Sequence, residues 1–146
     1  MIDTQHIGKK LPGYKVTAEA GQLRFFAKVT GETNPVYSDE AAARDAGHPG
    51  LPLPPTFLFS LEFNAPPSGW RDELGIVPNR ILHGEESFTY HRMAYAGDTL
   101  SFDTHIADIY AKKNGALEFV VRETRVSNQR GEHVADLRSV LVHRKI

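Results

Sequence analysis

The segment from Thr56 to Phe63 reads Thr-Phe-Leu-Phe-Ser-Leu-Glu-Phe and is apolar on nearly every side, whether it is drawn as a helix or as a strand. Such a segment must be enclosed by the rest of the chain, so it constrains the fold more than any other stretch. Periodicity does not separate a buried helix from a buried strand here. The prolines in the preceding loop, 48–55, favour a helix start, and Pro66-Pro67 would end the helix. We therefore expect a buried helix at about residues 55–64.

From about residue 80 onward the sequence is typical of antiparallel strands. Apolar and polar residues alternate over 87–92 and 100–107, and two further strand signals cover 117–126 and 133–143. Lys113-Asn114-Gly115 is a strong hairpin-turn signal. Helices followed by three or four such strands indicate an α+β fold. A sheet with one buried face needs a cover, and the apolar helix is the only element hydrophobic enough to supply it.

The first half of the chain carries two shorter helical signals. The pattern predicts a helix over about 18–29, with Thr17 as its N-cap, and another over 39–45, with Ser38 as its cap. Residues 64–79, which contain the single tryptophan, are expected to form an exposed excursion with short turns.

Length and composition narrow the function classes. At 146 residues, the whole chain (1–146) is expected to be one domain. The net charge of −1 argues against a nucleic-acid backbone binder, which normally carries a clear basic excess. The absence of cysteine excludes disulfides, thiolate zinc sites and a cysteine nucleophile. No apolar run approaches the ~20 residues of a membrane span, and the N-terminus lacks the pattern of an export signal. We therefore expect a cytoplasmic protein with no membrane partner.

Three segments in order resemble the MaoC-like (R)-specific hydratase/dehydratase family, closest to its N-terminal dehydratase-type branch. The first runs from Phe26 to Tyr37, the second is Pro54-Pro55-Thr56-Phe57, and the third runs from Leu82 to Arg92 and is followed by Ala96-Gly97-Asp98. The resemblance covers about residues 15–145. It implies the hotdog fold, in which an antiparallel sheet wraps around a central apolar helix. It also implies reversible hydration of an enoyl thioester, carried as CoA or as acyl carrier protein (ACP).

The resemblance implies an acid/base pair on the loop that carries Asn34-Pro35, and this chain departs from it. The family pattern is Gly-Asp-x-Asn-Pro-x-His, whereas the chain has Glu32 at the aspartate position and Tyr37 at the histidine position. Glu32 keeps a carboxylate but moves it by one methylene, and small misplacements can be costly in rate. Tyr37, with an ordinary pKa near 10, is a poor base at neutral pH.

The candidate catalytic residues are therefore Glu32, Tyr37 and His83, of which His83 is the best replacement base. The resemblance further implies that backbone N–H groups at the start of the central helix bind the thioester carbonyl. Removing a proton next to a thioester builds enolate charge, which oriented donors must meet. The candidate substrate-binding residues are Asn34, Thr56 and Phe57.

No metal and no cofactor are expected, because the histidines predicted on strands, including His133, have no acidic residue at metal-ligand spacing. Tyr90 is expected in the core. The expected partners are an acyl-CoA or acyl-ACP substrate and a second hotdog chain, in a homodimer or heterodimer.

Three readings of the function stay open. In the first, the chain is an active hydratase that uses another base. In the second, it is the non-catalytic subunit of a heteromeric dehydratase. In the third, it is a hotdog protein of different chemistry, such as an acyl-CoA thioesterase. The Glu32/Tyr37 pair is the feature that separates them.

Overall fold

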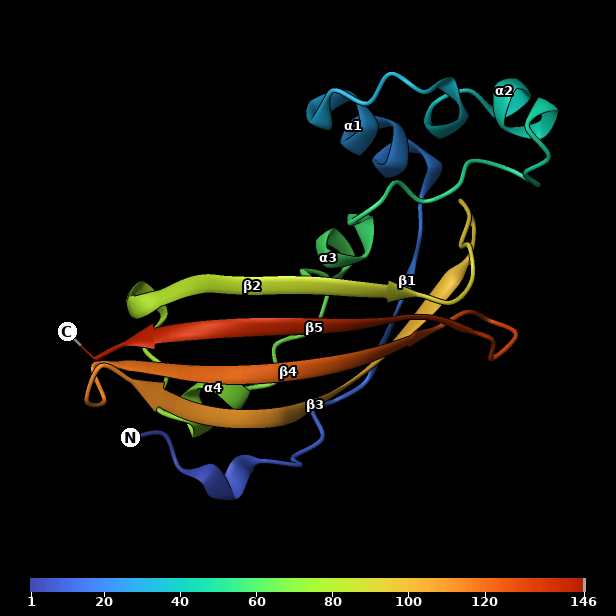
Figure 1. Cartoon of the computed structure of the whole chain (residues 1–146). Coiled ribbons are helices and arrows are strands. Elements are labelled where there is room, and N and C mark those ends of the chain that lie inside the picture. The colour runs from blue at the N-terminus through green and yellow to red at the C-terminus, as the bar shows by residue number, and fades with distance from the viewer. Residues whose placement is uncertain (146) are drawn as a thin grey trace.

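The computed structural model of the chain, described for residues 1–145, is built on one antiparallel sheet (Figure 1). The strands lie in the spatial order β1-β3-β4-β5-β2, so β1 and β2 form the two edges. Their bounds are β1 Tyr14–Thr17, β2 Ile81–Tyr90, β3 Thr99–Lys112, β4 Leu117–Ser127 and β5 His133–Arg144. Five strands are therefore present where the sequence predicted three or four. The missed strand is β1, which is too short for a periodic signal.

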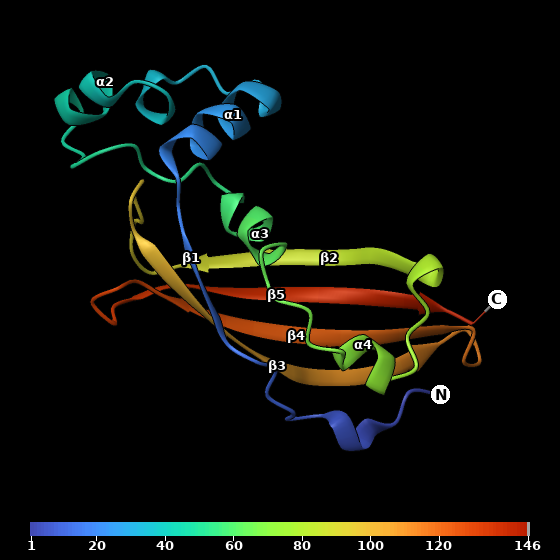
Figure 2. The same ribbon diagram turned by 180° about the vertical axis from the view of Figure 1, so that it is seen from behind.

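Helices occupy the sequence before and between these strands. The α-helices are α1 Ala20–Thr30, α2 Glu40–Asp45, α3 Phe57–Glu62 and α4 Trp70–Glu73, and 3-10 turns cover Thr4–His6, Pro35–Tyr37 and Pro78–Arg80. Seen from behind, α3 and α4 lie over the same face of the sheet, whereas α1 and α2 lie beyond its β2 edge (Figure 2). The chain is thus α+β, as the order of the sequence signals predicted.

The apolar segment forms the buried helix that the sequence predicted, although α3 is shorter than the expected span. Phe57, Leu58 and Leu61 are buried. They belong to one core cluster, which joins α1, α3 and the strands and includes Leu23, Leu51, Leu100, Phe102, Val126 and Leu137. Burying such side chains supplies about 1.5–3 kcal/mol each. This core fixes α3 against the sheet and so fixes both ends of the helix.

The prediction of an exposed excursion over residues 64–79 holds for most of the segment but is wrong for Trp70, Leu74 and Ile76, which are buried. Trp70 is only 6% exposed and packs with Leu74, Ile76 and strand residues in a second core cluster. The segment folds back over the far end of the same sheet face, where α4 adds a second cover beside α3. A single large aromatic among turn residues carries no periodicity, so only the tertiary structure reveals its burial.

Two predicted helix caps are also wrong. Thr17 is the last residue of β1, and α1 begins three residues later after Glu19, which makes no side-chain cap bond. Asp39 caps α2 in place of Ser38, since its carboxylate accepts hydrogen bonds from the backbone N–H groups of Ala41 and Ala42. Both errors shift a helix start by one or two residues, which is the usual uncertainty of such boundaries.

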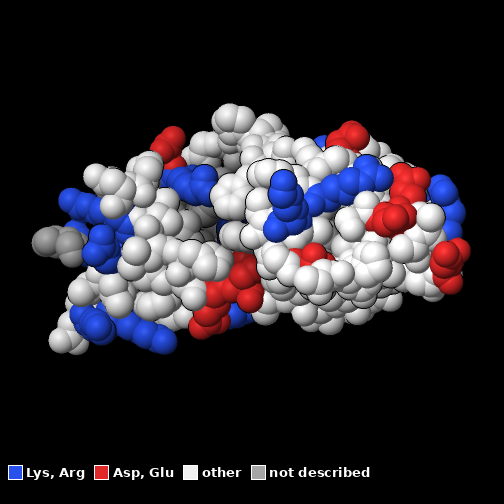
Figure 3. All heavy atoms as spheres, turned by 90° about the horizontal axis from the view of Figure 1, so that it is seen from above, with Lys and Arg blue, Asp and Glu red and all other residues white. Residues whose placement is uncertain are grey.

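The surface is consistent with the modest net charge. Acidic and basic side chains both occur on the face shown in Figure 3, without a continuous basic surface. Within residues 1–145, no helix is long and apolar enough to cross a membrane.

Candidate functional site

The loop after α1 is held by its own polar side chains. Gly31 ends the helix in the left-handed region, with φ of 73°. A carboxylate oxygen of Glu32 then accepts a hydrogen bond from the backbone N–H of Asn34 at 2.8 Å. The side-chain oxygen of Asn34 in turn accepts from the N–H of Val36 at 3.2 Å and caps the turn Pro35–Tyr37. Glu32 and Asn34 thus shape the turn that presents Tyr37.

Tyr37 lies at the start of α3, on a cavity of about 120 Å³. The cavity is lined by Tyr37, Leu53, Pro54, Pro55, Leu58, Tyr90, Arg92, Met93, Ala94 and Val134. Tyr37 comes from the loop after α1 and Tyr90 from the end of β2, so two phenol groups face one apolar space. We call this space the helix-start cavity. Its lining includes no carboxylate and no imidazole.

The start of α3 is strained and its first donor is occupied. Thr56 has φ of 70°, a left-handed conformation that is costly for a β-branched residue. Its backbone N–H donates to the hydroxyl of Tyr90 at 3.1 Å. The N–H of Phe57 donates instead to the carbonyl of Pro54 at 3.1 Å. Strain of this kind often marks sites where a backbone group must be held in a set direction.

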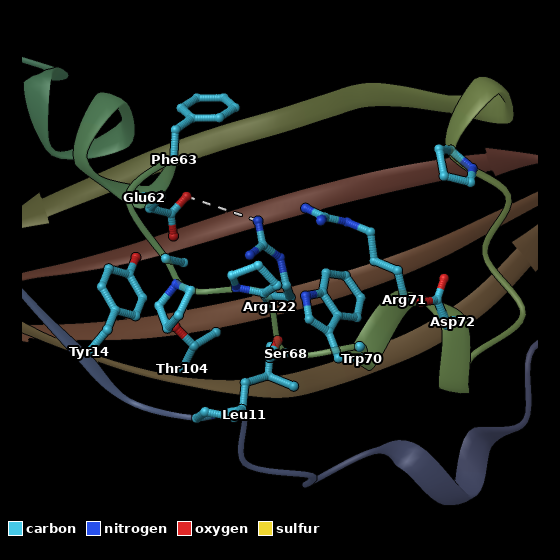
Figure 4. Close-up of a pocket in the computed structure, with 16 residues that line it drawn as sticks. Leu11, Tyr14, Glu62, Phe63, Ser68, Trp70, Arg71, Asp72, Thr104 and Arg122 are labelled. Carbon is cyan, nitrogen blue, oxygen red and sulfur yellow. Dashed lines mark ion pairs between the residues drawn. The ribbon is translucent and has the colours of Figure 1, made fainter.

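The other end of α3 carries a buried ion pair. The side chain of Glu62, the last residue of the helix, is 8% exposed and lies 3.9 Å from a guanidinium nitrogen of Arg122 on β4. Figure 4 shows the two groups pointing toward each other above the sheet, between Tyr14 and Trp70. They line a cavity of about 430 Å³ that also contacts α4. We call this space the helix-end cavity.

A row of polar side chains crosses the sheet beneath Glu62. In the strand register, Glu86 on β2 pairs with Ser139 on β5, and Ser139 pairs with Arg122 on β4. Arg122 donates a hydrogen bond to the Ser139 hydroxyl at 2.9 Å. Thr124, two residues along β4, donates to the other oxygen of Glu62 at 3.3 Å. These residues share the face that carries α3.

The electrostatics of this row are set by burial. Burial raises the pKa of Glu86 to about 7, and the nearby Ser139 hydroxyl opposes that shift. Burial also raises the pKa of Glu62, although Arg122 and Thr124 hold it down in part. Burial raises the pKa of Tyr14 beside them, and the charge of Glu62 adds to the effect. The row therefore places carboxyl groups where their charged form is disfavoured.

His83 lies away from the helix-start cavity. Its ring packs against Phe59, with 5.2 Å between ring centroids, and it lines a cavity with Glu62, Arg122 and Ser139. The structure thus brings Tyr37, Thr56 and Phe57 together at one end of α3 and places His83 near its other end. Glu32 and Asn34 lie in the adjoining turn.

A separate cluster could offer three metal ligands. His91, His133 and Asp136 have ligand atoms within 4.8 Å of one another, so the expectation that His133 lacks an acidic neighbour is wrong. The carboxylate of Asp136 lies 2.7 Å from His91 and 2.8 Å from His133. Arg125 lies 3.1 Å from the other nitrogen of His133. Because arginine can only donate, Nδ1 of His133 accepts from Arg125, and Nε2 carries the proton that points at Asp136. A metal ion bound between His133 and Asp136 would have to displace that proton.

Sequence reasoning missed Tyr90, Glu62 and Arg122. Tyr90 was expected in the core and is instead 50% exposed, because it closes the helix-start cavity from the edge strand. Glu62 interrupts the apolar segment from Phe57 to Phe63, whereas Arg122 follows Val120-Val121 and begins the polar stretch 122–125. For Glu62 the available signal was a charged residue inside an otherwise apolar run, and Arg122 had no such signal.

Comparison with known proteins identifies the relatives of this chain. A family model described as "FAS1-like, dehydratase domain region" matches residues 5–137. A UPF0336 protein of Streptomyces coelicolor is 35% identical over 147 aligned positions, covering 98% of this chain and 95% of the relative.

Solved structures match the fold. A structure of the HadBC (3R-hydroxyacyl-ACP dehydratase) complex from Mycobacterium tuberculosis superposes with a TM-score of 0.76 at 24% identity, covering 91% of this chain and 93% of the other. The R-hydratase PhaJ1 from Pseudomonas aeruginosa superposes with a TM-score of 0.72 at 22% identity, covering 96% and 83%. These neighbours confirm the hotdog architecture and the resemblance to MaoC-like hydratases expected from the sequence.

Proposed function

This chain belongs to the FAS1-like dehydratase-region family, and on that premise we propose that it binds an acyl thioester as the substrate-binding subunit of a heteromeric 3-hydroxyacyl dehydratase. The substrate is a 3-hydroxyacyl or enoyl thioester of CoA or ACP. The second chain of the complex supplies the acid/base pair. Such a complex would work in the cytoplasm.

One observation carries the proposal, namely the composition of the helix-start cavity. The residue at the family's histidine position, Tyr37, faces this cavity, but the carboxylate of Glu32 bonds to the N–H of Asn34 in the adjoining turn. The cavity lining offers the phenol hydroxyls of Tyr37 and Tyr90 and the guanidinium of Arg92, which can donate to a carbonyl, and no group that serves as a base near neutral pH. This supports binding of the thioester without its activation.

The edge strand β2 supports the presence of a second chain. It is ten residues long, and it pairs with β5 on one side only. A long open edge is usually covered in native proteins. Apolar side chains are exposed near that edge, among them Phe25 on α1, Phe63 after α3 and Leu82 on β2. A second hotdog chain that continues the sheet at β2 would cover them, as either a copy or a homologue.

A second candidate function rests on His83. This imidazole lines a cavity with Glu62 and Arg122, so a chain that is active alone would use it as the replacement base. Its position away from Tyr37 and Thr56 argues against this alternative, because a base must reach the carbon next to the bound carbonyl.

Turnover by the purified chain alone tests the proposal. Hydration of crotonyl-CoA is followed by the loss of enoyl absorbance, and binding of octanoyl-CoA is measured by calorimetry as a control. We expect binding without turnover, and turnover when a hotdog chain with an intact Asp/His pair is added. Turnover by the chain alone that His83→Ala abolishes would favour the second candidate. A folded protein that binds no acyl thioester, alone or with a partner chain, would exclude both.

A further inference from the structure

The cavity that contains His83 lies between the end of α3 and the start of β2. Its volume is about 370 Å³, and apolar side chains such as Phe59 and Ile81 form most of its lining. Three basic side chains, those of Arg71, His83 and Arg122, line the same space. We call it the basic cavity. It shares no lining residue with the helix-start cavity, so it is a separate candidate site for a small molecule.

The charge of Arg71 is not compensated by a neighbouring carboxylate. Glu73, on the same short helix α4, pairs with Lys9. Figure 4 shows Asp72 on the far side of Arg71 from Arg122, and Asp72 lines the helix-end cavity but not the basic cavity. Among residues 1–145, no carboxylate lies within ion-pair distance of the Arg71 guanidinium. The exposed guanidinium is therefore available to a ligand.

The guanidinium of Arg71 instead faces a second positive charge. Its central carbon lies 4.9 Å from the centroid of the Trp70 ring, and that of Arg122 lies 5.5 Å from the same centroid. The two guanidinium groups point toward each other above the sheet (Figure 4). Burial lowers the pKa of Arg71, and the charge of Arg122 lowers it further. Two like charges held this close in a partly enclosed space attract an anion.

The acidic groups around the basic cavity do not cancel this charge. Glu62 is the one carboxylate in the lining, and it pairs with Arg122. Burial raises the pKa of the nearby Glu86 to about 7, so that group is fully ionised only at alkaline pH. With Glu62 offset by Arg122, the lining keeps the positive charge of Arg71, to which a protonated His83 adds.

We propose that the basic cavity binds a small molecule that carries an anionic oxygen group, a carboxylate or a phosphate, on an apolar body. The anion accepts hydrogen bonds from Arg71 and His83 and faces the positive charge of Arg122, whose Nη2 already donates to Ser139. The apolar body packs against Phe59 and the neighbouring strand residues.

Other occupants fit the charges less well. A cation would be repelled by the two guanidinium groups. An uncharged apolar molecule would displace water and leave Arg71 against Arg122 with no compensating charge. The inference goes beyond the proposed function, because it assigns a different ligand to a different site.

Calorimetry with the intact chain tests the proposal with octanoate, octyl phosphate, octanol and inorganic phosphate. We expect the amphipathic anions to bind about tenfold or more tightly than octanol, the gain of one hydrogen bond between charged groups. They should also bind more tightly than inorganic phosphate, which lacks the apolar body. The tighter of octanoate and octyl phosphate identifies the anionic group. Trp70 is the single tryptophan and contacts both arginines, so binding should also change the tryptophan fluorescence.

Variants place the binding in this cavity. Arg71→Gln removes the charge of an exposed side chain and should weaken binding of the anion by about tenfold or more. Arg71→Lys keeps the charge but loses the planar pair of donors, so its affinity should fall between those of the wild type and Arg71→Gln. The matched control is Arg138→Gln, since Arg138 is an exposed arginine of β5 outside both cavities, and this change should leave the affinity unaltered.

Three results would overturn the proposal. The first is that neither octanoate nor octyl phosphate binds more tightly than octanol. The second is an unchanged affinity in Arg71→Gln. The third is equal weakening in Arg71→Gln and Arg138→Gln, because the anions would then respond to the net charge of the protein and not to this cavity. Binding of octanoyl-CoA at the helix-start cavity tests the proposed function separately.

Discussion

The hydroxyl of Tyr90 accepts a hydrogen bond from the backbone N–H of Thr56, with 3.1 Å between oxygen and nitrogen. Because this bond uses a lone pair of the oxygen, the phenol proton is free to point into the helix-start cavity. Burial raises the pKa of Tyr90, opposed by the Thr56 N–H, so the hydroxyl keeps its proton at neutral pH. A thioester carbonyl in the cavity would therefore accept from a phenol that the start of α3 polarises.

Tyr90→Phe should consequently weaken binding of octanoyl-CoA by about tenfold, the loss of one such hydrogen bond. The expected cost in folding stability is about 1 kcal/mol or less, since Tyr90 is half exposed. Calorimetry gives the affinity, and urea unfolding gives the stability. Tighter binding would contradict this reading, because it would mean that the substrate carbonyl displaces the tyrosine from the N–H of Thr56.

Thr56→Gly should stabilise the protein. Thr56 holds φ of 70°, which costs a β-branched residue about 1 kcal/mol or more, whereas glycine adopts it freely. The residue before α4 has the same left-handed backbone, with φ of 67°, but there it is a glycine, Gly69, which adopts this conformation without strain. We expect the midpoint of urea unfolding to rise by the equivalent of about 1 kcal/mol.

The matched control is Gly69→Ala, which should lower stability because it introduces a side chain at positive φ with space around it. An unchanged or lower midpoint for Thr56→Gly would show that the Thr56 side chain contributes more than its backbone costs.

Glu86 should make stability decrease as the pH rises. Below pH 4.5 the carboxyl of Glu86 is protonated in both the folded and the unfolded chain, so it does not lower folding stability there. The pKa of Glu86 in the folded chain, about 7, lies above its ordinary value of 4.5. Ionisation of this carboxyl therefore lowers the free energy of unfolding progressively between pH 4.5 and 7, and the full loss is reached at higher pH. Allowing for solvent screening of a partly exposed group, the penalty is about 1–2 kcal/mol at alkaline pH.

Glu86→Gln should remove that dependence and stabilise the protein above neutral pH but not at mildly acidic pH. Urea unfolding across the pH range checks it. The neighbouring Glu85→Gln is the control, since the side chain of Glu85 is 70% exposed and this change should leave the pH profile of the wild type unaltered. A Glu86→Gln profile that keeps the wild-type slope would assign the slope to other groups.

The sequence predicts the fold better than it predicts the site. The central helix, the β3–β4 hairpin at Lys113-Asn114-Gly115 and the strand-rich second half all follow from local signals. Asn114 and Gly115 adopt the positive φ that the hairpin signal implies, as does Lys113. Trp70 was missed because its burial depends on a segment that folds back across the sheet. Such a return is a tertiary feature and leaves no periodic trace.

The residues of the candidate site also fall into those that the sequence indicates and those that only the fold brings together. The family motif leads to Tyr37 and Thr56, which the fold places on one region at the start of α3. The pairing of Glu62 with Arg122 joins residues far apart in the sequence, through the register of β4 beneath the end of α3. No local pattern reports a contact of that kind, although the charge of Glu62 within its apolar run was visible in the sequence.

The double variant Glu32→Asp with Tyr37→His tests the central claim most directly, because it rebuilds the acid/base pair of the family on the same turn. Crotonyl-CoA hydration is measured for the wild type and the double variant, each purified alone, with octanoyl-CoA binding as the control. A substrate-binding subunit that lacks only the pair should show background turnover as wild type and turnover above background as the double variant, with binding retained in both. Turnover by the wild type alone, lowered or unchanged in the double variant, would contradict the account.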